Sequence, residues 1–139
     1  ATTEIYTLSL HDALPISLLV RRVKPSSAKA KGRTFQQWVR DRILDTFPAL
    51  EADDVRSTSM GAGGEDLQLS PAARRDFPYS VECKANKSFA VYKIMEQATA
   101  NAPDGSEPIA FIKGDRRKPL AVIDAMYFFN IIRKNHENT

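Results

Sequence analysis

The sequence predicts an α/β sandwich in which helices flank a central mixed β-sheet. Three segments repeat apolar residues every three or four positions, which is typical of helices with one buried face: 33–47, 88–101 and the stretch after Asp124. Five short runs have alternating or mainly apolar side chains, which is typical of strands: 53–58, 66–70, 79–84, 109–113 and 120–123. The expected order is therefore α-β-β-β-α-β-β-α.

The first sixteen residues are set apart from the rest of the chain. Residues 1–16 resemble the in-frame translation of a short-read sequencing adapter, and they lack the basic start of a secretory signal. We interpret them as a non-native leader. Without them the chain has 123 residues, with 20 basic and 15 acidic side chains and a net charge of +5. That length suits one compact domain, which we expect over residues 32–134.

Composition excludes several kinds of site. The single cysteine excludes an internal disulfide and a CxxC zinc site. Outside the leader the chain has one histidine, His136, which argues against histidine-metal nucleases and against Ser-His or Cys-His catalysis. No apolar run approaches the roughly 20 residues that span a membrane, so we expect a cytoplasmic protein without a membrane partner.

The two ends of the domain are expected to be irregular. Residues 17–31 contain several basic side chains and are interrupted at Pro25. We interpret them as a flexible basic arm that contacts phosphate or, equally, as a solvated start. The helix 33–47 buries a stripe through Phe35, Val39 and Ile43 and ends before Pro48. Residues 135–139 are expected to fray.

Two neighbouring strands carry the acidic residues on which the functional prediction depends. One passes through Asp66, and the next passes through Glu82 and Lys84. Because successive side chains of a strand point to opposite faces, Glu82 and Lys84 share one face. If both strands turn their apolar faces to a common core, Asp66 meets the other two on the opposite face. Two acids and a lysine are costly to desolvate, and a divalent cation bound by the carboxylates would compensate them.

The spacing of these residues resembles a known signature. Asp66, a spacer and then Glu82-Cys83-Lys84 resemble the signature of the PD-(D/E)XK nuclease superfamily, and the wider stretch 59–67 resembles the small resolvase-like endonucleases of phages and prophages. Glu65 stands where the signature has its proline. The resemblance covers residues 28–134 and implies a restriction-endonuclease-like sandwich.

The resemblance also implies a role for each site residue. Asp66 and Glu82, with the carbonyl of Cys83, would bind one or two Mg²⁺ ions, for which Mn²⁺ would substitute. Lys84 would orient the attacking water or help to deprotonate it. Two glutamines would help to position the site without binding the metal: Gln36 in the first helix and Gln97 in the second. For Gln36, an ordinary exposed glutamine is the alternative.

Basic residues in two connecting segments are candidates for contact with the phosphates of DNA. The segment 71–78 is expected to be a loop that carries Arg74 and Arg75. The strands 109–113 and 120–123 look like a hairpin with Arg116, Arg117 and Lys118 at its tip. For each set the alternative is a plain solvated surface.

Together with the resemblance, the sequence therefore predicts an Mg²⁺-dependent deoxyribonuclease that hydrolyses DNA phosphodiester bonds. The resemblance to resolvases makes a structure-specific, Holliday-junction-resolvase-like activity one option, and the substrate is open between a junction, a nick, a free end and a specific duplex. Two symmetric cuts would favour a homodimer. The alternatives are a nucleic-acid-binding module with a degenerate site and a structural protein that needs neither metal nor DNA.

Overall fold

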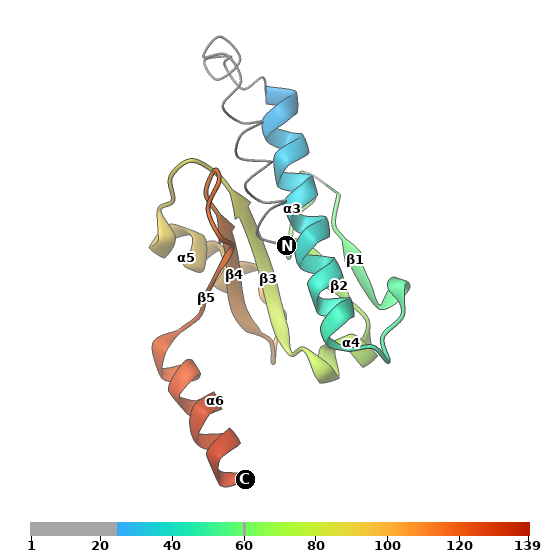
Figure 1. Cartoon of the computed structure of the whole chain (residues 1–139), viewed down its shortest axis with the longest axis vertical. Helices are drawn as coiled ribbons and strands as arrows, with labels where there is room; N and C mark the ends of the chain where they lie inside the picture. The colour runs from blue at the N-terminus through green and yellow to red at the C-terminus, as the bar shows by residue number, and fades with distance from the viewer. Residues whose placement is uncertain (1–24, 60) are drawn as a thin grey trace, which may run out of the picture.

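The computed structural model describes residues 25–59 and 61–139, which form a mixed α/β fold (Figure 1). The predicted leader 1–16 and the first part of the predicted arm, 17–24, lie outside the described residues. The described elements are α3 (Pro25–Thr46), the 3₁₀ turn η1 (Ala52–Asp54), β1 (Val55–Ser57), β2 (Leu67–Leu69), α4 (Pro71–Asp76), β3 (Tyr79–Ala85), α5 (Val91–Asn101), β4 (Glu107–Lys113), β5 (Leu120–Val122) and α6 (Ala125–Glu137).

The five described strands lie in two sheets, whereas the sequence predicted one central mixed sheet. In the first sheet β1 pairs antiparallel with β2. In the second, β3 runs parallel to β4, and β4 runs antiparallel to β5. The ladder does not pass from β2 to β3. Before β2 the chain turns at Gly61 and Gly64, which have φ angles of 86° and 94°. One backbone bond, from Asp66 N to Val81 O at 2.9 Å, joins the two sheets at this point.

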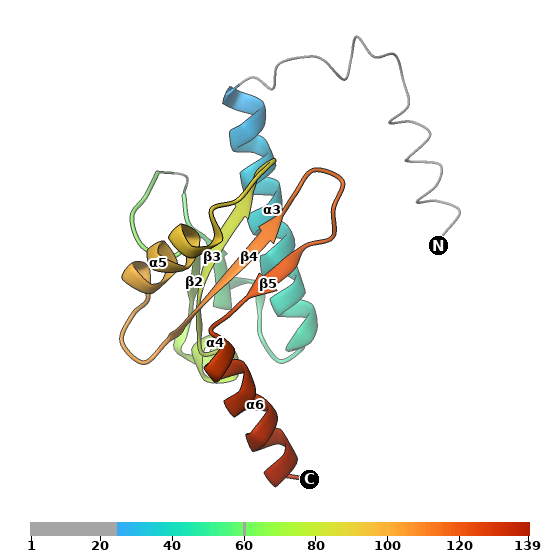
Figure 2. The same ribbon diagram turned by 90° about the vertical axis from the view of Figure 1, so that its left-hand side faces the viewer.

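Helices cover both faces of the three-stranded sheet, with α3 on one side and α5 on the other (Figures 1 and 2). Alternation along β3 and β4 sorts their side chains between the two helices. Val81, Cys83 and Ile109 pack with Phe35, Val39 and Ile43 of α3. Ala110 and Ile112 pack with Ile94 of α5. The predicted apolar stripe of the first helix is therefore buried as expected.

The first helix begins eight residues earlier than predicted, so residues 25–31 of the predicted flexible arm are helical. Proline is tolerated in the first turn of a helix, and the sequence after it alternates alanine and lysine, which are strong helix formers. Lys31 forms an ion pair with Asp115 of the β4–β5 hairpin, which holds this part of the helix against the domain.

Two further segments are more regular than predicted. The segment 71–78 was expected to be a loop but contains the short helix α4. Ser70 caps it by accepting a bond from Ala73 N at 3.1 Å, and Pro71 follows the cap, which is a favoured start for a helix. The predicted frayed tail 135–139 is helical as far as Glu137, and Asn138 N bonds to Lys134 O at 3.1 Å.

Other local predictions are confirmed. The segments 109–113 and 120–123 form an antiparallel hairpin, with Ala110 opposite Val122. Asp124 caps the last helix by accepting a bond from Tyr127 N at 2.8 Å. None of the described helices combines the length and the apolar character that crossing a bilayer requires.

The alternation in β2 can be tested with two neighbouring residues. Leu67 is fully buried against α3, whereas Gln68 is exposed. Leu67→Ala should lower the free energy of unfolding by about 2–5 kcal/mol, because it leaves a cavity in the core. Gln68→Ala is the control and should change it by no more than about 0.5 kcal/mol. Urea titration measures both, and equal effects would show that β2 does not have this register.

Candidate active site

Asp66 is held at the edge of β3 by its backbone and by its side chain. Its amide donates to Val81 O at 2.9 Å, and its carbonyl accepts from Thr58 N at 2.8 Å. Its Oδ2 accepts from Cys83 N at 2.7 Å. The carboxylate is thus fixed beside the middle of β3, which is where the predicted pairing of the two strands would place it.

Glu82 and Lys84 lie on the same face of β3, as the alternation predicted. Lys84 Nζ is 3.1 Å from Glu82 Oε1. Glu82 is 2 % exposed and is therefore one of the most deeply buried charged groups in the described part of the chain. Besides burial, the nearby charge of Asp66 raises the pKa of Glu82. The charge of Lys84 lowers the pKa of both carboxylates. The structure brings together all three residues that the sequence selected as catalytic.

Gln36 contacts the site directly, although the sequence left open whether it was an ordinary exposed residue. It is 6 % exposed, and its side chain lies close enough to Asp66 to help lower the pKa of that carboxyl against the larger effect of burial. Ser57 Oγ donates to Gln36 Oε1 at 2.7 Å. Because the hydroxyl occupies the oxygen of the amide, the NH₂ group is the one left to face Asp66. Sequence reasoning missed Ser57, for which no signal exists in the sequence.

Asn101 is a second residue that sequence reasoning missed. From the end of α5, its side chain lies close enough to Glu82 to help lower the pKa of that carboxyl against the larger effect of burial. Gln97, which was predicted to support the site, lies one turn earlier and is exposed. Residues four apart in a helix lie on the same side, so Gln97 flanks Asn101 at the margin of the site. The four-residue spacing of two amides in α5 was a signal that could have selected Asn101.

The carbonyl of Cys83 emerges at the edge of β3 that faces Asp66. In a strand, the N–H and C=O groups of one residue point to the same side. Because Cys83 N donates to Asp66, Cys83 O is directed to that side as well. The thiol is a different matter, since it packs in the core beneath α3, and burial raises the pKa of Cys83 well above its usual value. A protonated, buried thiol is no metal ligand.

The charges of the site are unbalanced. Two carboxylates face one ammonium group, so Asp66, Glu82 and Lys84 together carry a net charge of −1 in a partly desolvated position. Burial is the main cause that raises the pKa of Asp66 and of Glu82 in the metal-free protein, and for Glu82 the nearby charge of Asp66 adds to it. A divalent cation would change the net charge of this group from −1 to +1.

The donor atoms fit magnesium or manganese. Carboxylate and carbonyl oxygens are hard ligands, and Mg²⁺ is commonly bound by one or two carboxylates with water in its other positions. Within residues 25–59 and 61–139, no cluster of three or more His, Cys, Asp or Glu side chains is arranged to hold a metal ion. A closed zinc site built from protein side chains is therefore not present in this part of the chain.

Arg74 was predicted to contact DNA, and the structure shows that its guanidinium also binds other parts of the domain. Its guanidinium makes a two-pronged ion pair with Glu65, at 2.6 and 3.1 Å. The same group donates to Tyr79 O at 3.1 Å and to Ser106 Oγ at 3.2 Å. Through these bonds, Arg74 joins the segment before β2 to the starts of β3 and β4. These contacts give Arg74 a structural role, and its contact with DNA stays a prediction.

The other four predicted phosphate contacts lie at opposite ends of the sheet. Arg75 is on α4, beside the start of β3. Arg116, Arg117 and Lys118 are exposed at the hairpin tip, beyond the end of β4 (Figure 2). A seven-residue strand separates these ends by roughly 23 Å. Arg75 and the hairpin tip therefore form two separate basic surfaces.

Comparison of the chain with protein-family models, with curated proteins and with solved structures gave no match. The functional argument rests on the residues of the site.

The structural role of Arg74 can be separated from a role in binding. Arg74→Met should lower the free energy of unfolding by about 2 kcal/mol, because it leaves the half-buried Glu65 carboxylate without its partner. Arg75→Met, on the same helix but exposed, is the matched control and should change it by about 0.5 kcal/mol or less. Urea denaturation measures the free energy of unfolding of the two variants. An equal loss in both would show that the Arg74–Glu65 ion pair does not stabilise the fold.

The charge imbalance predicts how pH affects the metal-free protein. Folding raises the pKa of Asp66 and Glu82, so the folded state binds these protons more tightly than the unfolded state. Their contribution to stability is present below the ordinary carboxyl pKa of about 4 and is lost as pH rises through the raised values. Asp66→Asn removes one of these groups and relieves the other.

As pH rises from about 4 towards 7 in EDTA, the unfolding free energy of the variant should therefore increase relative to that of the parent. Added Mn²⁺ should reverse the order by stabilising the parent more than the variant. Parallel pH profiles for parent and variant would contradict the proposed imbalance.

Proposed function

We propose that this chain is a metal-dependent DNA endonuclease with the restriction-endonuclease-like sandwich of the PD-(D/E)XK superfamily. The observation that carries the proposal is the convergence of the Asp66 and Glu82 carboxylates, the Lys84 ammonium and the Cys83 carbonyl at one edge of β3. The order of the described elements is compatible with it, since a helix, three strands, a helix, a hairpin and a helix follow one another apart from the short α4.

The residues of the site divide the work of phosphodiester hydrolysis among them. Asp66 and Glu82, with Cys83 O, would hold Mg²⁺ or Mn²⁺. A bound metal ion of this kind stabilises charge on the phosphate and lowers the pKa of its water. The bond from Cys83 N fixes the direction of the Asp66 carboxylate. Gln36 and Asn101 hold the two carboxylates in place from opposite faces of the sheet.

Lys84 supplies the positive charge nearest to the reacting groups. Its ammonium can donate an N–H to a water oxygen and offset the charge of a phosphate oxygen. Because Lys84 already neutralises part of the charge of Glu82, it also limits repulsion between the site and an incoming phosphate. These are the roles that the resemblance implies for the lysine of the signature.

A second candidate function is a nucleic-acid-binding module whose site is weak or inactive. Gln36 favours it, because a neutral amide contacts Asp66 at a place where related nucleases often carry a glutamate. Such a module would bind DNA without cleaving it. For the endonuclease, cuts placed symmetrically on two strands would require a twofold homodimer.

Cleavage of supercoiled plasmid in Mg²⁺ and Mn²⁺ tests the proposal. Asp66→Asn and Glu82→Gln should each reduce the nicking rate by at least about 100-fold, because each removes a charged ligand. Both should bind DNA as well as the parent or more tightly, since repulsion of phosphate falls. Lys84→Met should slow nicking while calorimetry still detects Mn²⁺ binding. Gln36→Ala should reduce the nicking rate by about 10–100-fold.

Asp53→Asn is the matched control for the charge change. Asp53 is 89 % exposed and lies on η1, so nicking by this variant should equal that of the parent. Glu65→Gln is unsuitable as a control because it would break the ion pair with Arg74. A parent that binds DNA but nicks no faster than Asp66→Asn would favour the inactive module. If all the variants nick as fast as the parent, the endonuclease proposal is wrong.

A further inference from the structure

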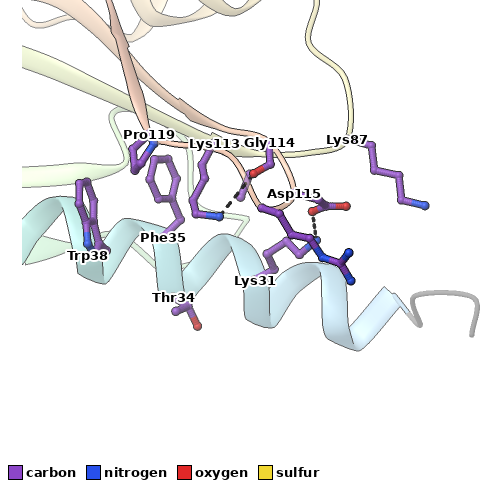
Figure 3. A pocket seen from close by; sticks show the side chains of 11 residues that line it. Lys31, Thr34, Phe35, Trp38, Lys87, Lys113, Gly114, Asp115 and Pro119 are labelled. Carbon is purple, nitrogen blue, oxygen red and sulfur yellow. Dashed lines mark hydrogen bonds and ion pairs between the residues drawn. The ribbon is translucent and has the colours of Figure 1, made fainter. Parts of the chain in front are cut away.

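An open groove of about 850 Å³ lies outside the candidate active site, between α3 and the turn of the β4–β5 hairpin (Figure 3). The segment after β3 closes a third side. Residues far apart in the sequence therefore build it, from Lys31 on the helix to Lys87 and Pro119 on the two connecting segments. Its volume is within the range of ordinary ligand sites.

Positive charge dominates the rim of the groove. Four basic residues line it, and Asp115 is the one acid among its lining residues: Lys31, Lys87, Lys113 and Arg116 are the basic ones. Asp115 is paired with Lys31, and the charges of Lys87 and Lys113 act on the same carboxylate. One carboxylate against four cations leaves a net charge of +3, which is complementary to a polyanion.

The wall of the groove along α3 is apolar and aromatic. Phe35 is buried, and Trp38 is 39 % exposed and stacked on it, with ring centroids 5.9 Å apart. Pro119 faces them from the hairpin (Figure 3). The exposed part of the indole also lies within reach of Arg42, whose Cζ is 5.4 Å from the ring centroid. Arg42 does not line the groove but a neighbouring hollow that Trp38 also lines, so a base in the groove need not displace it.

The groove shares two elements with the candidate active site. Phe35 in the groove is the neighbour of Gln36, which contacts Asp66. Ala85 in the groove directly follows Lys84 on β3. A ligand in the groove would therefore lie at the end of the strand that carries the catalytic residues.

We propose that this groove binds a single-stranded polynucleotide, with its phosphates on the lysine rim and a base against the Trp38 and Pro119 walls. Proteins that bind single strands combine a basic groove with aromatic side chains in this way. A duplex keeps its bases stacked inside and can offer the rim only phosphates. As a statement about the substrate of the enzyme, namely DNA with an unpaired strand, the inference rests on the proposed endonuclease function.

The single tryptophan of the chain reports on the groove directly. A thymidine oligonucleotide of about 12 nucleotides, added in EDTA, should quench the Trp38 emission saturably. A blunt duplex of equal length and heparin should not, at the same concentration of charge. An RNA oligonucleotide is compared with the thymidine strand. The one that binds more tightly shows whether the groove favours RNA or DNA.

Salt and substitution test the basic rim. If three or four phosphates are neutralised, the binding constant should fall with salt with a log–log slope of about −2 to −3. Lys87→Gln and Lys113→Gln should each reduce the size of the slope by about 0.7. Lys134→Gln is the matched control, because it makes the same change of charge on α6, away from the groove (Figure 1). Its slope should equal that of the parent.

These outcomes separate the groove from the active site. Quenching that is equal for duplex, heparin and single strand, or that is unchanged in Lys87→Gln and Lys113→Gln, overturns the groove proposal. It does so even if the plasmid is nicked in Mg²⁺. Quenching by the single strand in EDTA, with the expected loss in both variants, supports the groove even if no nicking occurs. In that case it is the endonuclease proposal that fails.

Discussion

The junction at Asp66 is the constraint on which the rest of this structure depends. Two small sheets meet there, and the ladder between them is reduced to one backbone bond to Val81 and one side-chain bond from Cys83. Where a backbone acceptor would continue the ladder, Cys83 N instead donates to the Asp66 carboxylate, and this bond fixes the Asp66 side chain. The same bonds that hold β1 and β2 against β3 therefore also aim a carboxylate at the edge of β3, so fold and site cannot be separated at this residue.

Around this junction, the fold buries charged groups at the expense of stability. An apolar residue in place of Glu82 would be easier to bury, and the raised pKa of both carboxylates shows that the metal-free fold holds them at a cost. The surroundings limit this cost. The amides of Gln36 and Asn101 lie beside the carboxylates, Lys84 supplies one positive charge, and Ser57 fixes the amide of Gln36. Stability sacrificed in a compact cluster of polar groups is common at functional sites. It is the physical reason to regard this cluster as more than an exposed ion pair.

Sequence periodicity was sufficient to place the three central residues and insufficient for their surroundings. A period of two puts Glu82 and Lys84 on one face of β3 whatever the rest of the fold does, and a period of 3.6 buries Phe35, Val39 and Ile43. The structural contacts of Arg74 were not predicted because its partners, Glu65 and Ser106, come from segments that only the folded chain brings together. The division into two sheets was missed because alternation identifies strands but does not show which strands pair. The short helix α4, by contrast, had a readable signal in Ser70-Pro71 that was given too little weight.

The arrangement of charge gives the molecule a direction. Acidic side chains gather at the edge of β3 under the cover of α5, whereas lysines gather beyond the ends of β3 and β4, on the side of α3. A polyanion is repelled by the first surface and attracted by the second, and the sheet lies between the two. With no cation bound, the net charge of −1 at the site opposes the approach of a phosphate. A bound divalent cation would add two positive charges and reverse the sign to +1, so the site would then attract the phosphate that the proposed endonuclease cleaves.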